Sequence, residues 1–320
     1  MDTTREPNTL QEAVIYFSNP DNCLTFLVGR RWPNGVTCPT CGSRDVGLIA
    51  SRRMFQCKTR HPKSQFSVKL GTIFEDSPLG LDKWLPAMWM IASNRNGVSS
   101  WELHRALKVT QKTAWFMLHR IRLAMQDEAH GGKLAGEVEV DETFIGGKAR
   151  NMHKEKRAEK IHGRGPDGKA IVAAVLERGG KVRAKVVDTR RKPALQALVR
   201  DNVETGSALY SDALKSYDGL ASEYAHEVID HAEEYVRGNV HTNNCENFWS
   251  LLKRGINGTY VSEEPFHLFR YVDEQAFRYN TRLPMTDATR FDYLVRKVAG
   301  KRLTYAALTA NEDKKSEAVN

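Results

Sequence analysis

The chain contains 320 residues, of which 48 are Lys or Arg and 39 are Asp or Glu, so its formal net charge is +9 at pH 7. Hydrophobic residues make up 41% of the sequence, which excludes a disordered chain and collagen, and the length predicts two or three domains. No stretch approaches the roughly 18 apolar residues that a membrane-spanning helix requires, and the N-terminus lacks the apolar part of a signal peptide. We therefore expect a soluble, cytoplasmic protein whose positive charge favours polyanionic partners.

The first predicted elements are a short helix and a small module that contains three of the five cysteines. Apolar residues at helical spacing indicate the helix over about residues 9–19. Turn signals and short alternating stretches then predict small strands between Val46 and Phe66. We accordingly divide this part of the chain into an N-terminal helix segment, 1–30, and a cysteine module, 31–78.

The cysteines of this module form a metal-binding pattern. Two residues separate Cys38 from Cys41, fifteen separate Cys41 from Cys57, and three separate Cys57 from His61. Two close pairs of thiolate and imidazole ligands suit tetrahedral Zn²⁺, and a fully coordinated ion would be structural rather than catalytic. His61 could instead be a surface histidine, with the fourth ligand elsewhere. Five cysteines are too few for a disulfide scaffold in a chain of this length.

Helical periodicity defines the next segment, 79–130. One apolar helix begins near Leu81 and stops before Asn96-Gly97, and two further helices are predicted over 99–107 and 111–126. Two helices separated by so short a turn are typical of a helix-turn-helix, whose second helix enters the major groove of DNA. An ordinary helical hairpin with a basic, solvated face would show the same pattern. The candidate DNA contacts are Gln111, Lys112, Thr113, Trp115, His119 and Arg122.

From residue 134 onward, alternating patterns predict a mixed-sheet domain that we assign to 134–290, followed by a C-terminal tail, 291–320. The predicted order is three strands, a helix, a strand, a short helix, a strand and a final helical part. The fold class is therefore multidomain, with α+β and α/β parts. The strands are predicted over 137–141, 170–176, 181–187, 207–210 and 224–229, and the main helices over 193–203, 244–254 and 263–279.

Three carboxylates of this domain are candidates for a metal centre. Asp141 ends the first predicted strand, Asp212 directly follows the fourth, and Glu246 lies 34 positions further on, near the start of a helix. The first and fourth strands would be neighbours in a sheet of this order. Three carboxylates at one point repel each other unless cations lie between them, which predicts two Mg²⁺ (or Mn²⁺) ions acting in phosphoryl transfer. Taken singly, each acid also has a structural explanation, as a turn residue, a helix cap or part of a capping box.

Basic residues concentrate near these acids. Lys253 lies seven positions after Glu246, on the same helix face, where its ammonium could meet a phosphate. Residues 146–169 contain eight basic against three acidic side chains, and 190–192 form a second basic cluster. Both could clamp DNA through its phosphates, or be solvated insertions. The candidate contacts of this group are Lys148, Arg150, Lys154, Lys156 and Arg157, with Arg254 on the later helix.

Together these motifs resemble the bacterial insertion-sequence transposases that combine an N-terminal zinc ribbon, a helix-turn-helix segment and a ribonuclease-H-like DDE domain of the ISXO2-like type. The similarity covers about residues 30–285 in the order of that family. The similar stretches are Cys-Pro-Thr-Cys-Gly (38–42), Gln-Phe-Ser-Val-Lys-Leu-Gly-Thr-Ile-Phe-Glu-Asp-Ser (65–77), Lys-Thr-Ala-Trp-Phe-Met-Leu-His-Arg-Ile-Arg (112–122), Val-Asp-Glu-Thr-Phe-Ile-Gly-Gly (140–147), Tyr-Ser-Asp (210–212), His-Thr-Asn-Asn-Cys-Glu-Asn-Phe-Trp-Ser-Leu-Leu-Lys-Arg-Gly (241–255) and Phe-Arg-Tyr-Asn-Thr-Arg (277–282).

The resemblance implies a specific activity. It assigns the catalytic acids to Asp141, Asp212 and Glu246 and the following lysine to Lys253. It implies two Mg²⁺ ions per active site and one structural Zn²⁺. It further implies that a homodimer or larger assembly binds the terminal inverted repeats of double-stranded DNA, cuts both ends and joins them to target DNA. No membrane partner is implied.

Two departures from the family pattern and two rival functions remain. Many relatives complete the ribbon with cysteine where this chain has His61, and some place asparagine near the third acid, so Asn243 or Asn244 could assist Glu246. One rival is a non-catalytic DNA-binding regulator or domesticated transposase that keeps the ribbon and the helices. The other is a nuclease of the same fold that does not join strands.

Overall fold

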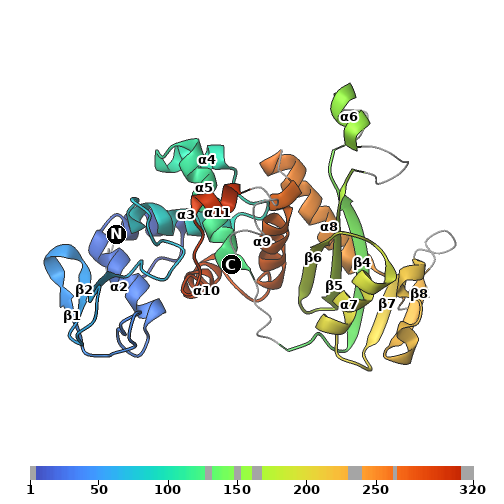
Figure 1. The fold of residues 1–320 in the computed structure, drawn as a ribbon, viewed down its shortest axis with the longest axis horizontal. Coiled ribbons are helices and arrows are strands. Elements are labelled where there is room, and N and C mark those ends of the chain that lie inside the picture. Colours follow the sequence, from blue (N-terminus) through green and yellow to red (C-terminus); the bar gives the residue numbers. More distant parts are fainter. Residues whose placement is uncertain are drawn as a thin grey trace. The chain divides into compact units, whose positions relative to one another are not determined.

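Figure 1 shows the computed structural model of the chain, which describes residues 5–126, 132–147, 153–160, 168–229, 240–261 and 265–310. The chain forms two compact units. The first combines Met1–Gln126 with Leu283–Asn320, and the second is Asp127–Arg282. No helix among the described residues is long and apolar enough to cross a membrane.

The first unit begins with two helices where the sequence pattern predicts one. Thr9 caps α1 (Leu10–Phe17) by accepting a hydrogen bond from the backbone N–H of Glu12, in a capping box. Pro20 then opens α2 (Pro20–Arg31), since proline fits the first turn, where its missing N–H is not needed. The sequence pattern does not indicate α2 because only three of its residues are buried.

A small antiparallel sheet follows these helices. Its strand order is β1-β2-β3, with Phe55 of β2 opposite Phe66 of β3 and their ring centroids 5.6 Å apart. Trp32 packs edge-on against both rings. The strands predicted between Val46 and Phe66 are thus confirmed. They are β1 (Val46–Ile49), β2 (Met54–Cys57) and β3 (Gln65–Ser67).

Three helices complete the N-terminal part of this unit. The apolar stripe of α3 (Leu81–Ser93) is buried, as its periodicity predicts. Lys108 adopts a left-handed conformation, φ 54°, in the turn between α4 (Ser100–Leu107) and α5 (Gln111–Met125). The three predicted helices are therefore confirmed to within a few residues.

The segment after Arg282 returns to the first unit, a placement that differs from the predicted domain boundary at 290 and the predicted tail at 291–320. It contains α10 (Asp287–Arg296) and α11 (Tyr305–Thr309). The periodicity of α10 marks an amphipathic helix, but the partners of its apolar face lie more than 200 positions earlier in the chain and cannot be read from local sequence. Residues 311–320 lie outside the described part of the chain.

Aromatic packing explains why α10 belongs to the first unit. The ring of Phe291 stacks on Phe26 of α2 with centroids 5.6 Å apart and meets Trp89 of α3 at 4.8 Å. Asp292 accepts a hydrogen bond from Arg30 of α2 at 2.7 Å. Beyond α10, the backbone N–H of Gly300 donates to Gly71.

The second unit is built on a five-stranded mixed sheet of order β6-β5-β4-β7-β8. β4, β5 and β6 pair antiparallel, whereas β7 runs parallel to β4 and β8 parallel to β7. The first and fourth strands of this unit are therefore neighbours, as predicted. The strands are β4 (Glu137–Ile145), β5 (Ala170–Glu177), β6 (Val182–Val187), β7 (Ala208–Asp212) and β8 (Ala225–Ile229).

Different helices cover the two faces of this sheet (Figure 1). Val138 and Val140 of β4 share a core with Leu195 and Val199 of α7 (Lys192–Asn202). The opposite face packs against α8 (Asn243–Gly255) and α9 (Leu268–Asn280). Because side chains alternate along a strand, Glu139 and Asp141 lie on the α8 side.

One strand differs from its predicted length in a way that matters for the site. β4 continues to Ile145, because β5 pairs with it as far as Ile145 opposite Ala170. Asp141 therefore lies inside a strand rather than at its end. A separate helix, α6 (Lys154–Lys160), lies between β4 and β5 in the sequence.

Candidate functional site

The sheet brings the two predicted aspartates together. The parallel register of β4 and β7 ends with Val140 opposite Ser211. The next residues are Asp141 on β4 and Asp212 on β7. Neighbouring strands lie about 4.8 Å apart, so the two carboxylates project side by side from the sheet. Asp212 is also the last residue of β7, and its Oδ1 accepts a hydrogen bond from the backbone N–H of Leu214 at 3.1 Å.

Asp141 lies in an environment that disfavours its charge. Burial is the main cause that raises the pKa of Asp141 to about 7, and repulsion by Glu142 and Asp212 adds to it. The hydrogen bond that Trp249 Nε1 donates to Asp141 Oδ2, at 2.8 Å, opposes the rise in pKa. A carboxyl group in this state requires either a proton or a nearby cation at neutral pH.

Helix α8 turns one face toward this pair through Trp249. Glu246 lies three positions before Trp249, and Lys253 lies four positions after it, so all three share one side of the helix. Glu246 is exposed and Lys253 is half-buried. Among the described residues, Asp141, Asp212 and Glu246 are not gathered into a compact group of ligands that could hold a metal ion. The structure therefore pairs the aspartates and leaves Glu246 on the adjacent helix.

A fourth acid, Glu139, holds that helix in place and was missed by the sequence reasoning. Its fully buried carboxylate accepts hydrogen bonds from the backbone N–H groups of Asn244, at 2.9 Å, and Cys245, at 3.1 Å. Arg178 Nε donates to it at 2.8 Å. The signal was the alternation of Glu-Val-Glu-Val-Asp, which puts Glu139 on the same face as Asp141.

The contacts of Glu139 determine the role of Asn244 and the way in which the N-terminus of α8 is capped. The side-chain amide of Asn244 donates to Glu139 at 2.7 Å, so Asn244 is engaged in holding the helix. The helix has Thr242 as its N-cap and no side-chain hydrogen bond at the cap, so Asn243 and Glu246 do not form a capping box. The buried carboxylate of Glu139 satisfies the first N–H groups instead.

On the opposite face of β4, Glu142 is held by other partners. Tyr217 Oη donates to Glu142 at 2.9 Å, and an Arg190 guanidinium nitrogen lies 3.6 Å from the carboxylate. Burial, followed by the charge of Asp212, raises the pKa of Glu142.

In the first unit, the predicted zinc ligands form a compact group. The ligand atoms of Cys38, Cys41, Cys57 and His61 all lie within 4.8 Å of one another. His61 Nδ1 lies 2.7 Å from the carbonyl oxygen of Pro62, to which it can donate, and this leaves Nε2 to face the cysteines. Cys38 Sγ is 3.4 Å from His61 Nε2, so the structure brings His61 to the position of a fourth ligand.

Two cysteines of this group, Cys38 and Cys57, have a lowered pKa, whereas the pKa of Cys41 is raised. Burial opposes ionisation of Cys38, but the backbone N–H groups of Cys41 and Thr40 outweigh it, and the pKa of Cys38 falls to about 6. Thiolate is the form that binds zinc. The donor set therefore fits Zn²⁺ and supports a structural zinc.

The predicted DNA contacts of α5 are only partly accessible. Lys112 is exposed, whereas Gln111 donates its side-chain amide to Ser100 Oγ at 2.8 Å. The hydroxyl groups of Thr113 and Thr110 lie 2.7 Å apart, and Trp115 is half-buried. The prediction that His119 and Arg122 contact DNA is wrong, because α5 is buried on all sides from Met117 to Arg122. Neither side chain can therefore reach a groove.

The basic residues predicted in the second unit are less completely described. Lys154 and Arg157 are exposed on α6, and Arg254 is exposed on α8. Lys148 and Arg150 lie outside the described residues, as does the side chain of Lys156.

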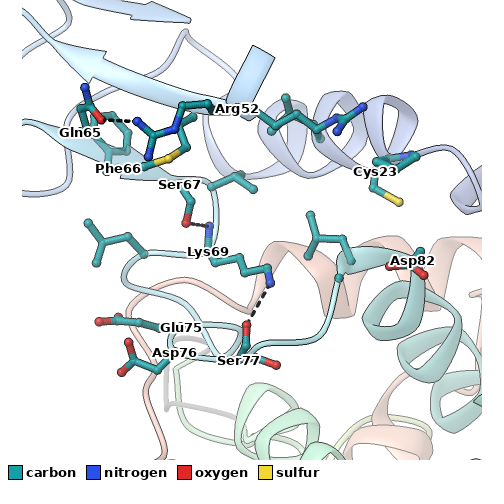
Figure 2. A pocket seen from close by; sticks show the side chains of 18 of the residues that line it. Cys23, Arg52, Gln65, Phe66, Ser67, Lys69, Glu75, Asp76, Ser77 and Asp82 are labelled. Atoms are coloured by element: carbon teal, nitrogen blue, oxygen red, sulfur yellow. Dashed lines mark hydrogen bonds between the residues drawn. The ribbon is translucent and has the colours of Figure 1, made fainter. Parts of the chain in front are cut away.

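Figure 2 shows a pocket of about 970 Å³ in the first unit, between β3, α2 and the start of α3. Lys69 reaches across it and donates to the carbonyl oxygen of Ser77 at 3.2 Å, and Arg52 donates to Gln65 at 3.1 Å. None of the residues predicted as ligands or DNA contacts is among those that line it. Ser67 Oγ also accepts a hydrogen bond from the backbone N–H of Lys69 at 3.3 Å, so these polar groups stabilise the loop around Lys69.

Two domain families match the chain. Residues 18–59 match a transposase zinc-ribbon domain, and residues 133–280 match an ISXO2-like transposase domain. The chain is 30% identical over 254 residues to an "uncharacterized protein in transposable element ISH50" of Halobacterium salinarum, covering 75% of this chain and 84% of that protein. It is 33% identical over 104 residues to an "uncharacterized transposase-like protein" of Haemophilus influenzae, covering 31% of this chain and 81% of that protein. The chain therefore belongs to the insertion-sequence transposases with a zinc ribbon and an ISXO2-like transposase domain.

Proposed function

We propose that this transposase is a DDE enzyme that binds the terminal inverted repeats of its element, cuts both ends and joins them to target DNA by two-metal phosphoryl transfer. The observation that carries the proposal is the adjacency of Asp141 and Asp212 on parallel strands. Trp249 adds support, because its hydrogen bond to Asp141 directs the Glu246 face of α8 to this pair. The mixed sheet of order β6-β5-β4-β7-β8 is the arrangement expected of a ribonuclease-H-like domain.

The donor set fits hard divalent cations such as Mg²⁺ or Mn²⁺. Carboxylate oxygens are the ligands that such ions prefer, and the raised pKa of Asp141 indicates a carboxyl group that lacks a counter-charge. Asp141, Asp212 and Glu246 would hold the ions. When bound, two such ions supply activation of the attacking oxygen and stabilisation of the leaving oxygen.

Other residues would bind and orient the DNA. Lys253, on the same side of α8 as Glu246, would neutralise a phosphate of the reacting strand. We propose a helix-turn-helix role for α4 and α5, with the exposed Lys112 among the contacts. Lys154, Arg157 and Arg254 would contact phosphates. Because two ends must be cut together, we propose a dimer or larger assembly on nucleoid DNA.

The test uses the purified full-length chain with labelled duplexes that carry the ends of its element. We expect cutting and joining that depend on Mg²⁺. The variants Asp141→Asn, Asp212→Asn and Glu246→Gln should each lose more than the roughly 10–100-fold that loss of an outer-shell partner of a metal costs. Glu204→Gln, an exposed acid at the other end of β7, is the matched control and should act as the parent does.

The outcomes separate the rival functions. Variants that cut and join as well as the parent would contradict the metal-site assignment. A parent that cuts without joining would be a nuclease. A parent that binds the ends but never cuts them would be a regulator.

A further inference from the structure

A pocket of about 500 Å³ opens in the second unit, at the same end of the sheet as the two aspartates. The ends of β4 and β5, the loop between β6 and α7, and the turn after β7 form its walls. Phe144 belongs to the face of β4 that carries Glu142, so the pocket lies on the face away from α8.

The charge of this pocket is mostly positive. Its lining includes three basic residues, Lys169, Arg190 and Arg191, and a single acidic residue, Asp188. Arg191 is exposed, and Lys169 is half-buried. Neither side chain forms an ion pair within the described part of the chain, so both cations are available to a ligand.

Arg190 is held in a defined position. Its guanidinium lies 4.9 Å from the centre of the Phe144 ring and 3.6 Å from the carboxylate of Glu142. Ser216 Oγ donates to the backbone carbonyl of Arg190 at 2.6 Å. The side chain nevertheless keeps 41% of its surface exposed. A guanidinium fixed in this way retains donors that point away from its carboxylate partner, which is the geometry that suits a phosphate.

The backbone at the end of β4 allows Lys169 to lie close. Gly146 has φ +148°, and a Cβ there would lie 3.3 Å from Lys169 Cγ. Glycine at this position therefore leaves room for the aliphatic part of Lys169 beside the strand.

The pocket and the proposed metal site lie at the same end of the sheet, on opposite faces, and two backbone segments link them. Glu142, the partner of Arg190, is the residue after Asp141. Leu214, which lines the pocket, donates its backbone N–H to Asp212. A DNA strand whose scissile phosphate lies at the aspartates would bring a neighbouring phosphate to this end of the sheet.

We propose that the pocket formed by Lys169, Arg190 and Arg191 binds a backbone phosphate of the DNA that enters the active site. The inference rests on the proposed function, because the ligand is the substrate of that reaction. The contact is with a phosphodiester group and carries no base specificity.

The test measures DNA binding without cutting. The full-length, zinc-loaded chain is titrated with a fluorescent duplex without added Mg²⁺ or Mn²⁺ and without chelator, at several salt concentrations. The affinity falls as salt rises, so the slope of log K against log salt is negative. Each phosphate contact that is lost should reduce the magnitude of this slope by about 0.9. Arg190→Ala and the double variant Lys169→Ala/Arg191→Ala should therefore show a slope of smaller magnitude and weaker binding than the parent.

Lys181→Ala is the matched control, because it removes one exposed cation of the same unit at the opposite end of β6. The double variant guards against misfolding of Arg190→Ala, since Lys169 and Arg191 have no described ion pair to lose. Parent-like slopes in all pocket variants, or an equal loss in Lys181→Ala, would overturn the proposal.

The proposed function can fail separately. If the parent binds DNA and the pocket variants bind it less well, but no Mg²⁺-dependent cutting occurs, the pocket stands and the catalytic proposal fails. If the parent cuts and the pocket variants bind as it does, the pocket proposal fails alone. A parent that binds no duplex would overturn both.

Discussion

Glu139 shows how one buried charge can join a sheet to a helix. Its carboxylate accepts hydrogen bonds from two N–H groups at the start of α8, from the amide of Asn244 and from Arg178. The negative charge also lies at the positive end of the helix dipole. The position of α8, and with it that of Glu246 and Trp249, thus depends on a residue outside the proposed set of metal ligands.

We predict that Glu139→Gln destabilises the second unit. The substitution keeps the size of the side chain but replaces one acceptor oxygen with an NH₂ group that faces N–H donors. It also removes the nearer of the two carboxylates beside the mostly buried Arg178, which keeps only Glu137 at 3.6 Å. Breaking a buried pair on one side costs about 3–5 kcal/mol. Urea unfolding followed by circular dichroism would measure the change in unfolding free energy.

Glu227, an exposed acid of β8, provides the control for this prediction. Glu227→Gln makes the same chemical change on the surface and should unfold at the parent's urea midpoint. If Glu139→Gln also unfolds at that midpoint, the carboxylate does not hold α8.

At the scale of elements, the ribbon is too small to be stable by burial alone. Its three strands contain four, four and three residues, and its aromatic core is essentially Trp32, Phe55 and Phe66. Domains with so little core usually need a metal or disulfides. The Cys₃His group supplies the metal ligands, with Cys38 and Cys41 before β1 and Cys57 at the end of β2.

We predict one zinc per chain in the parent and less than one in His61→Ala, because three cysteines leave tetrahedral zinc without its fourth ligand. His61→Cys should restore the zinc content. Elemental analysis of the dialysed protein measures both. Cys23→Ala is the control, since Cys23 is buried outside the ligand group and should not affect zinc. Full zinc content in His61→Ala would place the fourth ligand elsewhere.

Local sequence patterns predict most elements of this chain but few of the contacts between them. Strong periodicity locates α3, α4 and α5, and strand alternation orders the second unit well enough to pair Asp141 with Asp212. The weak apolar stripe of α2 gives no comparable signal. The burial of His119 and Arg122 depends on neighbours of α5 that its own sequence does not specify.

In the candidate site, too, local sequence predicts some residues but not the contacts between distant segments. Asp141, Asp212 and the four zinc ligands follow from residue type and spacing. The role of Glu139 does not, because an inward-facing acid on a strand becomes a helix cap only when a helix terminus lies opposite it. The partners of Arg190 likewise come from two separate segments, β4 and the turn after β7.

At the scale of the whole molecule, the second unit is inserted into the first. The chain leaves the first unit after Gln126 and returns at Leu283. On its return, α10 buries Phe291 against α2 and α3, and Asp292 meets Arg30. The first unit, with its ribbon and its helical pair, is therefore completed only by residues that follow the second.

We predict that a chain shortened to residues 1–282 keeps a folded second unit but has a loosened first unit. Losing Phe291 alone should cost about 3–5 kcal/mol, the usual effect of removing a large buried aromatic side chain, so Phe291→Ala is the milder form of the same change. Hydrogen exchange measured by mass spectrometry should show faster exchange in α2 and α3 and unchanged protection in β4, β5 and β7. A chain of residues 1–310 retains α10 and should exchange like the parent. Full protection of α3 in the 1–282 chain, or equal loss of protection in both units, would show that the first unit does not depend on its C-terminal segment.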